Sequence, residues 1–239
     1  MILWPQPDGT VLATPQPAHA LVAGELMRRM VPRPAPFAPV VNAACQHDCA
    51  WLPWEAAPEF DAGSGLPRAF NAVPGHAHVP MWEKGVATAL ANWGLWEALL
   101  ILRHGTHIYG IGSRTGASPE SRAAMEGYVA RASVQGAAWM ERLGVTEAEV
   151  APLSQALAVV DGIALALCWG HEAFDCAGTR LARTTPFAAA LAPWPLDVPA
   201  LEVETTALRL PAGFADAAAM REGLPKAERV ALRFALSPA

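Results

Sequence analysis

An adjacent histidine and aspartate, His47-Asp48, lie within the segment Val40–Glu55 (VVNAACQHDCAWLPWE) and offer an imidazole and a carboxylate for metal binding or proton transfer. Apolar residues recur at three- and four-residue steps through this segment, which predicts a helix with the pair on its inward face. An unpartnered imidazole or carboxylate in the interior costs several kcal/mol. The pair therefore predicts polar partners elsewhere in the chain.

Asp161 lies at the centre of the most apolar window, Leu153–Gly170. Its helical neighbours three and four positions away are all apolar, so it has no local partner. A buried unpaired charge is very unfavourable. An arginine, a helix N-terminus or a metal ion shared with other inward ligands would each satisfy it.

Two further histidines lie on the apolar stripes of other predicted helices. His19 belongs to Ala18–Met30 and His104 to Leu95–His104, so four predicted helices each place a metal-binding side chain inward. Nitrogen and carboxylate oxygen together suit Mn²⁺, Fe²⁺, Zn²⁺, Co²⁺ or Ni²⁺ better than Ca²⁺. The alternative for any single histidine is a hydrogen-bonded core residue, and for the whole set a buried polar network without metal. The predicted metal ligands are His19, His47, Asp48, His104 and Asp161.

The order His19, His47-Asp48, Asp161 resembles the signature of the HD superfamily of metal-dependent phosphohydrolases. HALVAGEL is similar to the opening helix of that superfamily, and LAVVDGIALAL to its closing helix. The resemblance implies a first metal bound by these four residues, with Asp48 bridging to a second ion beside His104. His76, His78 or His107 would complete that second site.

A longer pattern covers nearly the whole chain. QPAHALVAGEL, HDCAWLPWEAAP, ALLILRHGTHIYG and APWPLDV together look like a bacterial family of uncharacterised proteins, a domain of unknown function.

The superfamily resemblance implies hydrolysis of a small phosphate ester or nucleotide. Asp48 and Arg103 are the expected catalytic residues, since Arg103, or Arg114 in the Gly-rich segment, would neutralise the phosphate. Both arginines have a solvated surface position as their alternative. The alternative function is a non-catalytic metal- or ligand-binding protein on the same scaffold.

The residues that follow the pair are open to two interpretations. We expect Trp51 in the core, whereas Trp54 either packs in the core or stacks on a flat substrate group. Glu55 is expected to orient water or a ligand histidine.

Two other motifs favour structural interpretations. Cys45 and Cys49 are four residues apart, as in a zinc site, but His47 would point roughly 160–200° away from either on a helix. Small buried residues explain the two cysteines better. GIGSRTG lacks the Lys-Ser/Thr ending of a phosphate loop.

The chain is predicted to be a single mainly α domain over 1–239, an HD-domain-like helical bundle with a small antiparallel β element. The helical body spans about 14–192, with long loops at Pro58–Pro80 and Asp175–Thr185. The β element, about 2–13 and 197–237, combines a hairpin around Pro-Asp-Gly with the alternating strands Leu201–Leu210 and Arg229–Leu236.

Composition narrows the cellular context. Hydrophobic residues make up 53% of the 239 positions and charged ones 16%, as in a globular chain with a large core. A net charge of −5 without basic clusters argues against nucleic acid. The N-terminus lacks the pattern of a signal peptide, the apolar window is short for a membrane span, and four cysteines make no disulfide framework. We expect a soluble cytoplasmic protein whose partner is a small phosphate compound.

Overall fold

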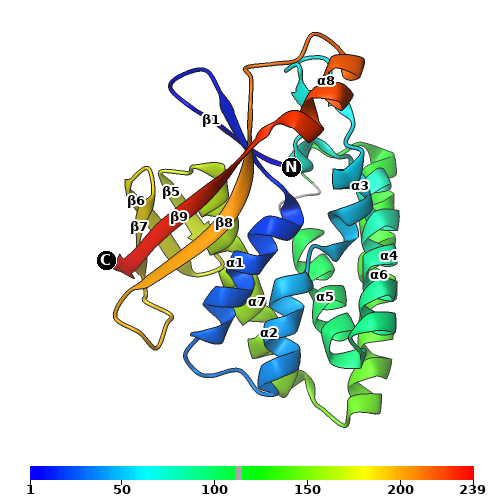
Figure 1. Ribbon diagram of the computed structural model, residues 1–239. Coiled ribbons are helices and arrows are strands. Elements are labelled where there is room, and N and C mark those ends of the chain that lie inside the picture. Colours follow the sequence, from blue (N-terminus) through cyan, green and yellow to red (C-terminus); the bar gives the residue numbers. More distant parts are fainter. Residues whose placement is uncertain (111–114) are drawn as a thin grey trace.

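In the computed structural model, which describes residues 1–110 and 115–239, a curled seven-stranded sheet lies against a group of helices (Figure 1). The strand order is β1-β2-β8-β9-β7-β6-β5, and all neighbours are antiparallel except β7 and β9. A separate hairpin joins β3 (Phe60–Asp61) to β4 (Leu66–Pro67). The strands of the large sheet are β1 (Ile2–Pro5), β2 (Val11–Thr14), β5 (Ala173–Cys176), β6 (Thr179–Thr185), β7 (Ala188–Ala192), β8 (Leu201–Leu210) and β9 (Glu228–Pro238).

The prediction of a mainly α, HD-domain-like bundle is wrong, because the fold is mixed α/β. The strands predicted near the two termini are present, and β2 pairs with β8. However, the predicted loop Asp175–Thr185 is a hairpin, and β7 continues the sheet, so the helical body ends well before 192. The β7 sequence AAALA has a high intrinsic helix propensity. Its strand conformation comes from parallel pairing with β9, which is distant in sequence.

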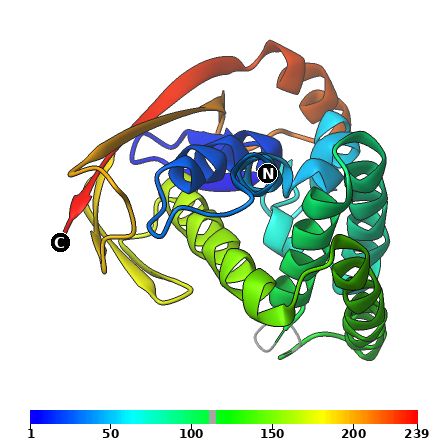
Figure 2. The ribbon, with the colours of Figure 1, turned by 90° about the horizontal axis from the view of Figure 1, so that it is seen from below.

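The helices extend along the chain between β2 and β5, apart from one short helix before β9. They are α1 (Gln16–Arg28), α2 (Phe37–Gln46), α3 (Leu52–Ala56), α4 (Gly75–Asn92), α5 (Leu95–Ile108), α6 (Pro119–Leu143), α7 (Glu147–Trp169) and α8 (Ala217–Gly223), with short 3₁₀ turns at Cys49–Trp51, Phe70–Ala72 and Leu224–Lys226. The predicted loop Pro58–Pro80 therefore contains the small hairpin and the first turns of α4. Seen from below, α1 and α7 lie between the sheet and the remaining helices (Figure 2).

Helix α7 is the central element of the core. It packs against α1, α2 and α5 on one side and against β1, β5 and β6 on the other. Among the described residues it is the helix long and apolar enough to cross a membrane, but 61% of its most apolar window is buried inside the protein. That burial is what a core helix of a globular fold shows.

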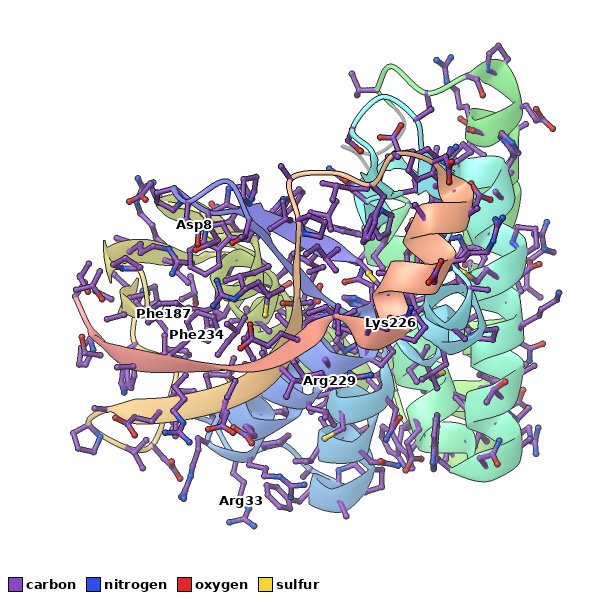
Figure 3. The ribbon with its side chains drawn as sticks, turned by 45° about the horizontal axis from the view of Figure 1, so that its top comes forward. Asp8, Arg33, Phe187, Lys226, Arg229 and Phe234 are labelled. Atoms are coloured by element: carbon purple, nitrogen blue, oxygen red, sulfur yellow. The ribbon has the colours of Figure 1, made fainter. Side chains whose placement is uncertain are left out.

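Side chains of the sheet connect it to the two central helices. Arg183 of β6 donates to the carbonyls of Ala166 (3.1 Å) and Leu167 (3.0 Å), which closes the C-terminal turn of α7. The Thr205 hydroxyl of β8 donates to the Ala18 carbonyl of α1 at 2.8 Å. On β9 the buried Phe234 has its ring centroid 5.9 Å from that of the half-exposed Phe187, and Figure 3 marks both. The hydrogen bonds of Arg183 and Thr205 fix α7 and α1, which carry two of the predicted metal ligands.

Candidate metal centre

The predicted helix Val40–Glu55 is interrupted at the His47-Asp48 pair. Helix α2 ends at Gln46, Asp48 has φ −99° and ψ 20°, and a 3₁₀ turn follows. On a continuous helix adjacent side chains diverge by about 100°. The break instead brings the Asp48 carboxylate to 3.7 Å from His47 Nε2.

A close helix contact supports this break. Gly85 of α4 packs against the turn so tightly that a Cβ there would lie 2.6 Å from the Ala50 Cβ and 2.9 Å from its Cα. Any larger residue would push the turn away from α4.

Three side chains from distant segments converge at the break. Asp161 Oδ1 of α7 lies 2.9 Å from His19 Nε2 of α1 and 3.1 Å from His47 Nε2. The ligand atoms of these three residues all lie within 4.8 Å of one another, so the group can hold a metal ion. Two more side chains adjoin it: His104 Nε2 of α5 is 3.4 Å from Asp161 Oδ2, and Asp48 Oδ2 is 3.4 Å from His19 Nδ1.

Hydrogen bonds to the backbone fix which nitrogen of each histidine faces the group. His19 Nδ1 lies 2.6 Å from the Gln16 carbonyl, and His47 Nδ1 lies 2.8 Å from the Ala44 carbonyl. A carbonyl only accepts, so each Nδ1 carries a hydrogen; a protonated ring then donates its Nε2–H to Asp161, whereas a neutral ring directs its Nε2 lone pair at that carboxylate. Two lone pairs facing one carboxylate oxygen repel it unless a proton or a metal ion lies between. Histidine ligands of metals are held by the same kind of bond at their second nitrogen, so these residues fit a metal ion.

The group is nearly sealed from water except at Asp161. His19, His47 and His104 are at most 2% exposed and Asp48 is 4% exposed, whereas the Asp161 side chain is 19% exposed. The buried His104 Nδ1 has no hydrogen-bond partner among the residues that the structure describes.

Burial and neighbouring charges shift the pKa values of these side chains in opposite directions. Burial lowers the pKa of an imidazole, but the Asp48 and Asp161 carboxylates outweigh it and raise the pKa of His47 to about 9. Burial would raise the pKa of Asp161, yet hydrogen bonds with the His104, His19 and His47 rings hold that pKa well below its usual range. Burial, with the nearby Asp161, raises the pKa of Asp48. The carboxylate of Asp161 therefore stays ionised and attracts cations.

The group forms part of the wall of a pocket of about 640 Å³, which is large enough for a small substrate. His19, Asp48, His104 and Asp161 line it together with mostly aromatic and aliphatic residues. The pocket opens the group to small molecules on the Asp161 side.

The structure thus brings together the side chains that the sequence suggested as metal ligands, His19, His47, Asp48, His104 and Asp161. The expected role of Arg103 in phosphate binding is not supported. Its guanidinium makes two bonds to the Glu147 carboxylate (2.8 and 2.6 Å) and one to the Ser154 hydroxyl (2.9 Å). Because Arg103 precedes His104 on a regular helix, its side chain points about 100° away from the pocket.

The other histidines do not join the group. His76 is exposed and contacts the Ser121 hydroxyl at 3.0 Å. His78 and His107 line the pocket, and the His107 ring stacks on that of His104 with centroids 6.1 Å apart. His76 and His78 lie in the first turns of α4 and His107 in α5, whereas all three were expected in loops.

The remaining predicted residues have structural surroundings. Arg114 and most of GIGSRTG lie outside the described residues. Cys45 and Cys49 are free thiols. Trp51 is buried yet reaches the pocket, and Trp54 packs edge-on behind it with centroids 5.4 Å apart.

Glu55 anchors the start of α1. It touches none of the five candidate ligands named above, which we call the metal group. Its carboxylate accepts from the Gln16 backbone N–H at 3.2 Å and pairs with the Met1 amino group at 2.9 Å. Because the Gln16 carbonyl in turn holds His19, Glu55 orients that ligand only through the backbone.

Several pocket residues were not predicted from the sequence. Trp82 and Phe70 have only the aromatic character of their side chains as a signal, and most tryptophans and phenylalanines are core residues. Asp175 and Cys176 lie in the hairpin that was predicted as a loop. Their position at the pocket depends on the sheet topology.

No curated protein and no solved structure matches the chain, and no finding links it to the HD superfamily. A family described as "Protein of unknown function (DUF3891)" matches residues 1–212, a range that includes every residue of the metal group and ends just after β8. The chain therefore belongs to the DUF3891 family of proteins of unknown function.

Proposed function

We propose that His19, His47 and Asp161 bind a divalent transition-metal ion and that the protein uses it to hydrolyse a small phosphate ester. One observation carries this proposal: two histidines with Nδ1 fixed to backbone carbonyls direct Nε2 at a single carboxylate oxygen, at the wall of a pocket. Without a metal ion each Nε2 must carry a proton to face that oxygen, whereas the ligand atoms of the three residues are close enough to share one ion.

The remaining donors complete the proposed site. We assign Asp48 as a further ligand from the side of His47, and His104 as the ligand nearest the second oxygen of Asp161. Imidazole and carboxylate donors suit Mn²⁺, Fe²⁺, Zn²⁺, Co²⁺ or Ni²⁺. When bound, such an ion lowers the pKa of a coordinated water to about 7 and polarises a phosphoryl oxygen.

The protein's own contribution is positioning and exclusion of water. The backbone bonds at Gln16 and Ala44 hold two rings in orientation before any ligand binds. Near-complete burial of the imidazoles strengthens their electrostatic interactions.

The second candidate is a metal- or ligand-binding protein without turnover. It is favoured by the pocket lining, which includes neither lysine nor arginine among the described residues, and by the engagement of Arg103 elsewhere. On this alternative the metal ion alone would supply positive charge for an anionic ligand.

Metal analysis and an activity panel test the proposal. Purified protein incubated with Mn²⁺ or Zn²⁺ and then desalted should retain the metal stoichiometrically, and Asp161→Asn should lose it with an unchanged circular dichroism spectrum. Asp175→Asn is the matched control, because Asp175 lines the same pocket but accepts a backbone hydrogen bond from Gly178. Stoichiometric metal in Asp161→Asn would overturn the ligand assignment. Metal without turnover on phosphate mono- and diesters would favour the binding protein.

The cysteines support our proposal that the protein works in the cytoplasm. All four are free, and three of them are buried. Free thiols persist in a reducing compartment.

A further inference from the structure

A row of aromatic rings runs along the pocket from the metal group. Beginning at His104, neighbouring ring centroids are 5.9 Å apart to Trp82, then 5.6 Å to His78, 4.9 Å to Trp51 and 6.5 Å to Phe70. All five side chains line the pocket. We call Phe70, Trp51, His78 and Trp82 the aromatic wall.

The rings of the aromatic wall are held in fixed orientations. Trp82 Nε1 donates to the Ile101 carbonyl at 3.3 Å, and His78 Nδ1 lies 2.8 Å from the Tyr109 hydroxyl. Trp51 is 2% exposed. A ligand that packs on such rings orders few additional side chains, which reduces the entropic cost of binding.

The described residues that line the pocket include no lysine or arginine, so they offer little positive charge. Burial lowers the pKa of His78 to about 4, so its ring is neutral at neutral pH. Asp175 adds a third carboxylate to those of Asp48 and Asp161. A ligand with several negative charges would be repelled by these carboxylates.

We propose that the aromatic wall binds a planar, uncharged ring, so that the substrate is an aryl ester with one phosphoryl group. The claim that the substrate is a phosphate ester rests on the proposed hydrolase function, whereas the claim that the pocket binds a planar ring does not. A planar ring would lie against the half-buried Phe70 and His78, whose own rings contact the buried Trp51 and Trp82, and such aromatic pairs contribute beyond their buried area. Sugar phosphates and polyphosphates have no ring of this kind and carry polar groups that the wall leaves unpaired.

Two ligands of nearly equal size test ring binding without catalysis. Calorimetric titration of the full chain should show 2-naphthol binding about three- to tenfold more tightly than its saturated analogue, decahydro-2-naphthol, because only the planar compound makes aromatic pairs. Tripolyphosphate should not compete with 2-naphthol. Equal affinity for the two alcohols, or competition by tripolyphosphate, would overturn the proposal.

A substitution in the aromatic wall tests where the planar ring of the ligand binds. Phe70→Leu retains an apolar side chain but removes one aromatic face, and it should weaken 2-naphthol binding about threefold or more while leaving the saturated alcohol unaffected. Phe187→Leu is the control, since Phe187 lies in the turn between β6 and β7, outside the residues that line the pocket. An equal loss in both variants, or none in Phe70→Leu, would contradict the assignment.

A turnover assay separates this inference from the proposed function. With Mn²⁺ present, kcat/KM should be at least about tenfold higher for 2-naphthyl phosphate than for glycerol phosphate, whose leaving group has no ring. Binding of 2-naphthol with no hydrolysis of either ester would retain the ring site and refute the hydrolase. Hydrolysis of glycerol phosphate without preference for the aryl ester would support the hydrolase and refute the ring site.

Discussion

The neutral His78 ring has a direct consequence for stability in acid. Burial lowers its pKa from 6.5 to about 4. Between these two values the unfolded chain binds a proton that the folded chain excludes. The free energy of unfolding therefore has its full value above about pH 6.5. It decreases as the pH falls towards 4, because the unfolded chain then binds the proton that the folded chain excludes.

The size of the effect follows from the same two values. At about 1.4 kcal/mol for each pH unit, the difference between 6.5 and about 4 sets an upper limit of about 3.5 kcal/mol. Integrating the linkage relation from about pH 7.5 to pH 5 gives a loss of about 2 kcal/mol attributable to this one ring.

Urea denaturation of the wild type and His78→Asn at these two pH values measures that loss. Asparagine keeps a polar group near the Tyr109 hydroxyl but does not titrate, so the variant should lose about 2 kcal/mol less than the wild type on acidification. His76→Asn is the control on the same helix, because His76 is exposed, and it should behave as the wild type. A difference below about 0.5 kcal/mol between wild type and His78→Asn would refute burial as the cause.

Three further substitutions test packing, an ion pair and a helix cap, each by urea denaturation. Gly105→Ala should destabilise by about 1–3 kcal/mol, because its Cβ would clash with the Tyr128 hydroxyl, and a neutral result would contradict the close contact. Arg103→Gln should cost less than about 1 kcal/mol, since its partner Glu147 is largely exposed, and should leave metal content unchanged; loss of metal would restore a role at the site. Ser118→Ala should cost about 1 kcal/mol through loss of the cap bond to the Ser121 N–H, and no loss would show that the cap is replaceable.

Local sequence signals sufficed for some elements and failed for others. Helix α6 is bounded by a serine cap at Ser118 and by Gly144 in the left-handed conformation, and both signals are visible in the sequence. Strand β8 alternates in LEVETTALRL, so its two faces are evident. The alanine-rich β7 has no such alternation, and its strand conformation depends on pairing with the distant β9.

The site was more predictable than the fold because polar residues on apolar helix faces need partners wherever the helices lie. His19 and Asp161 are each surrounded by apolar neighbours in sequence, and their mutual contact satisfies both. The break at His47-Asp48 was not predictable, since the apolar spacing continues through it. It depends on the contact between Gly85 and Ala50, which belong to different elements.

The separate origin of the donors makes metal binding a contribution to folding stability. His19, His47 and Asp161 come from α1, the end of α2 and α7, so the unfolded chain does not hold them together. Metal at about 100 times its Kd should therefore add about 2.7 kcal/mol to the free energy of unfolding. For a chain of this length that corresponds to a rise in Tm of roughly 5–10 °C.

Differential scanning calorimetry with and without Mn²⁺ or Zn²⁺ measures this rise, which Asp175→Asn should keep and Asp161→Asn should lose. An unchanged Tm in wild-type protein that holds stoichiometric metal would mean that the ion binds the unfolded chain as tightly as the folded one. Ligands gathered by the fold from three helical segments are incompatible with that result.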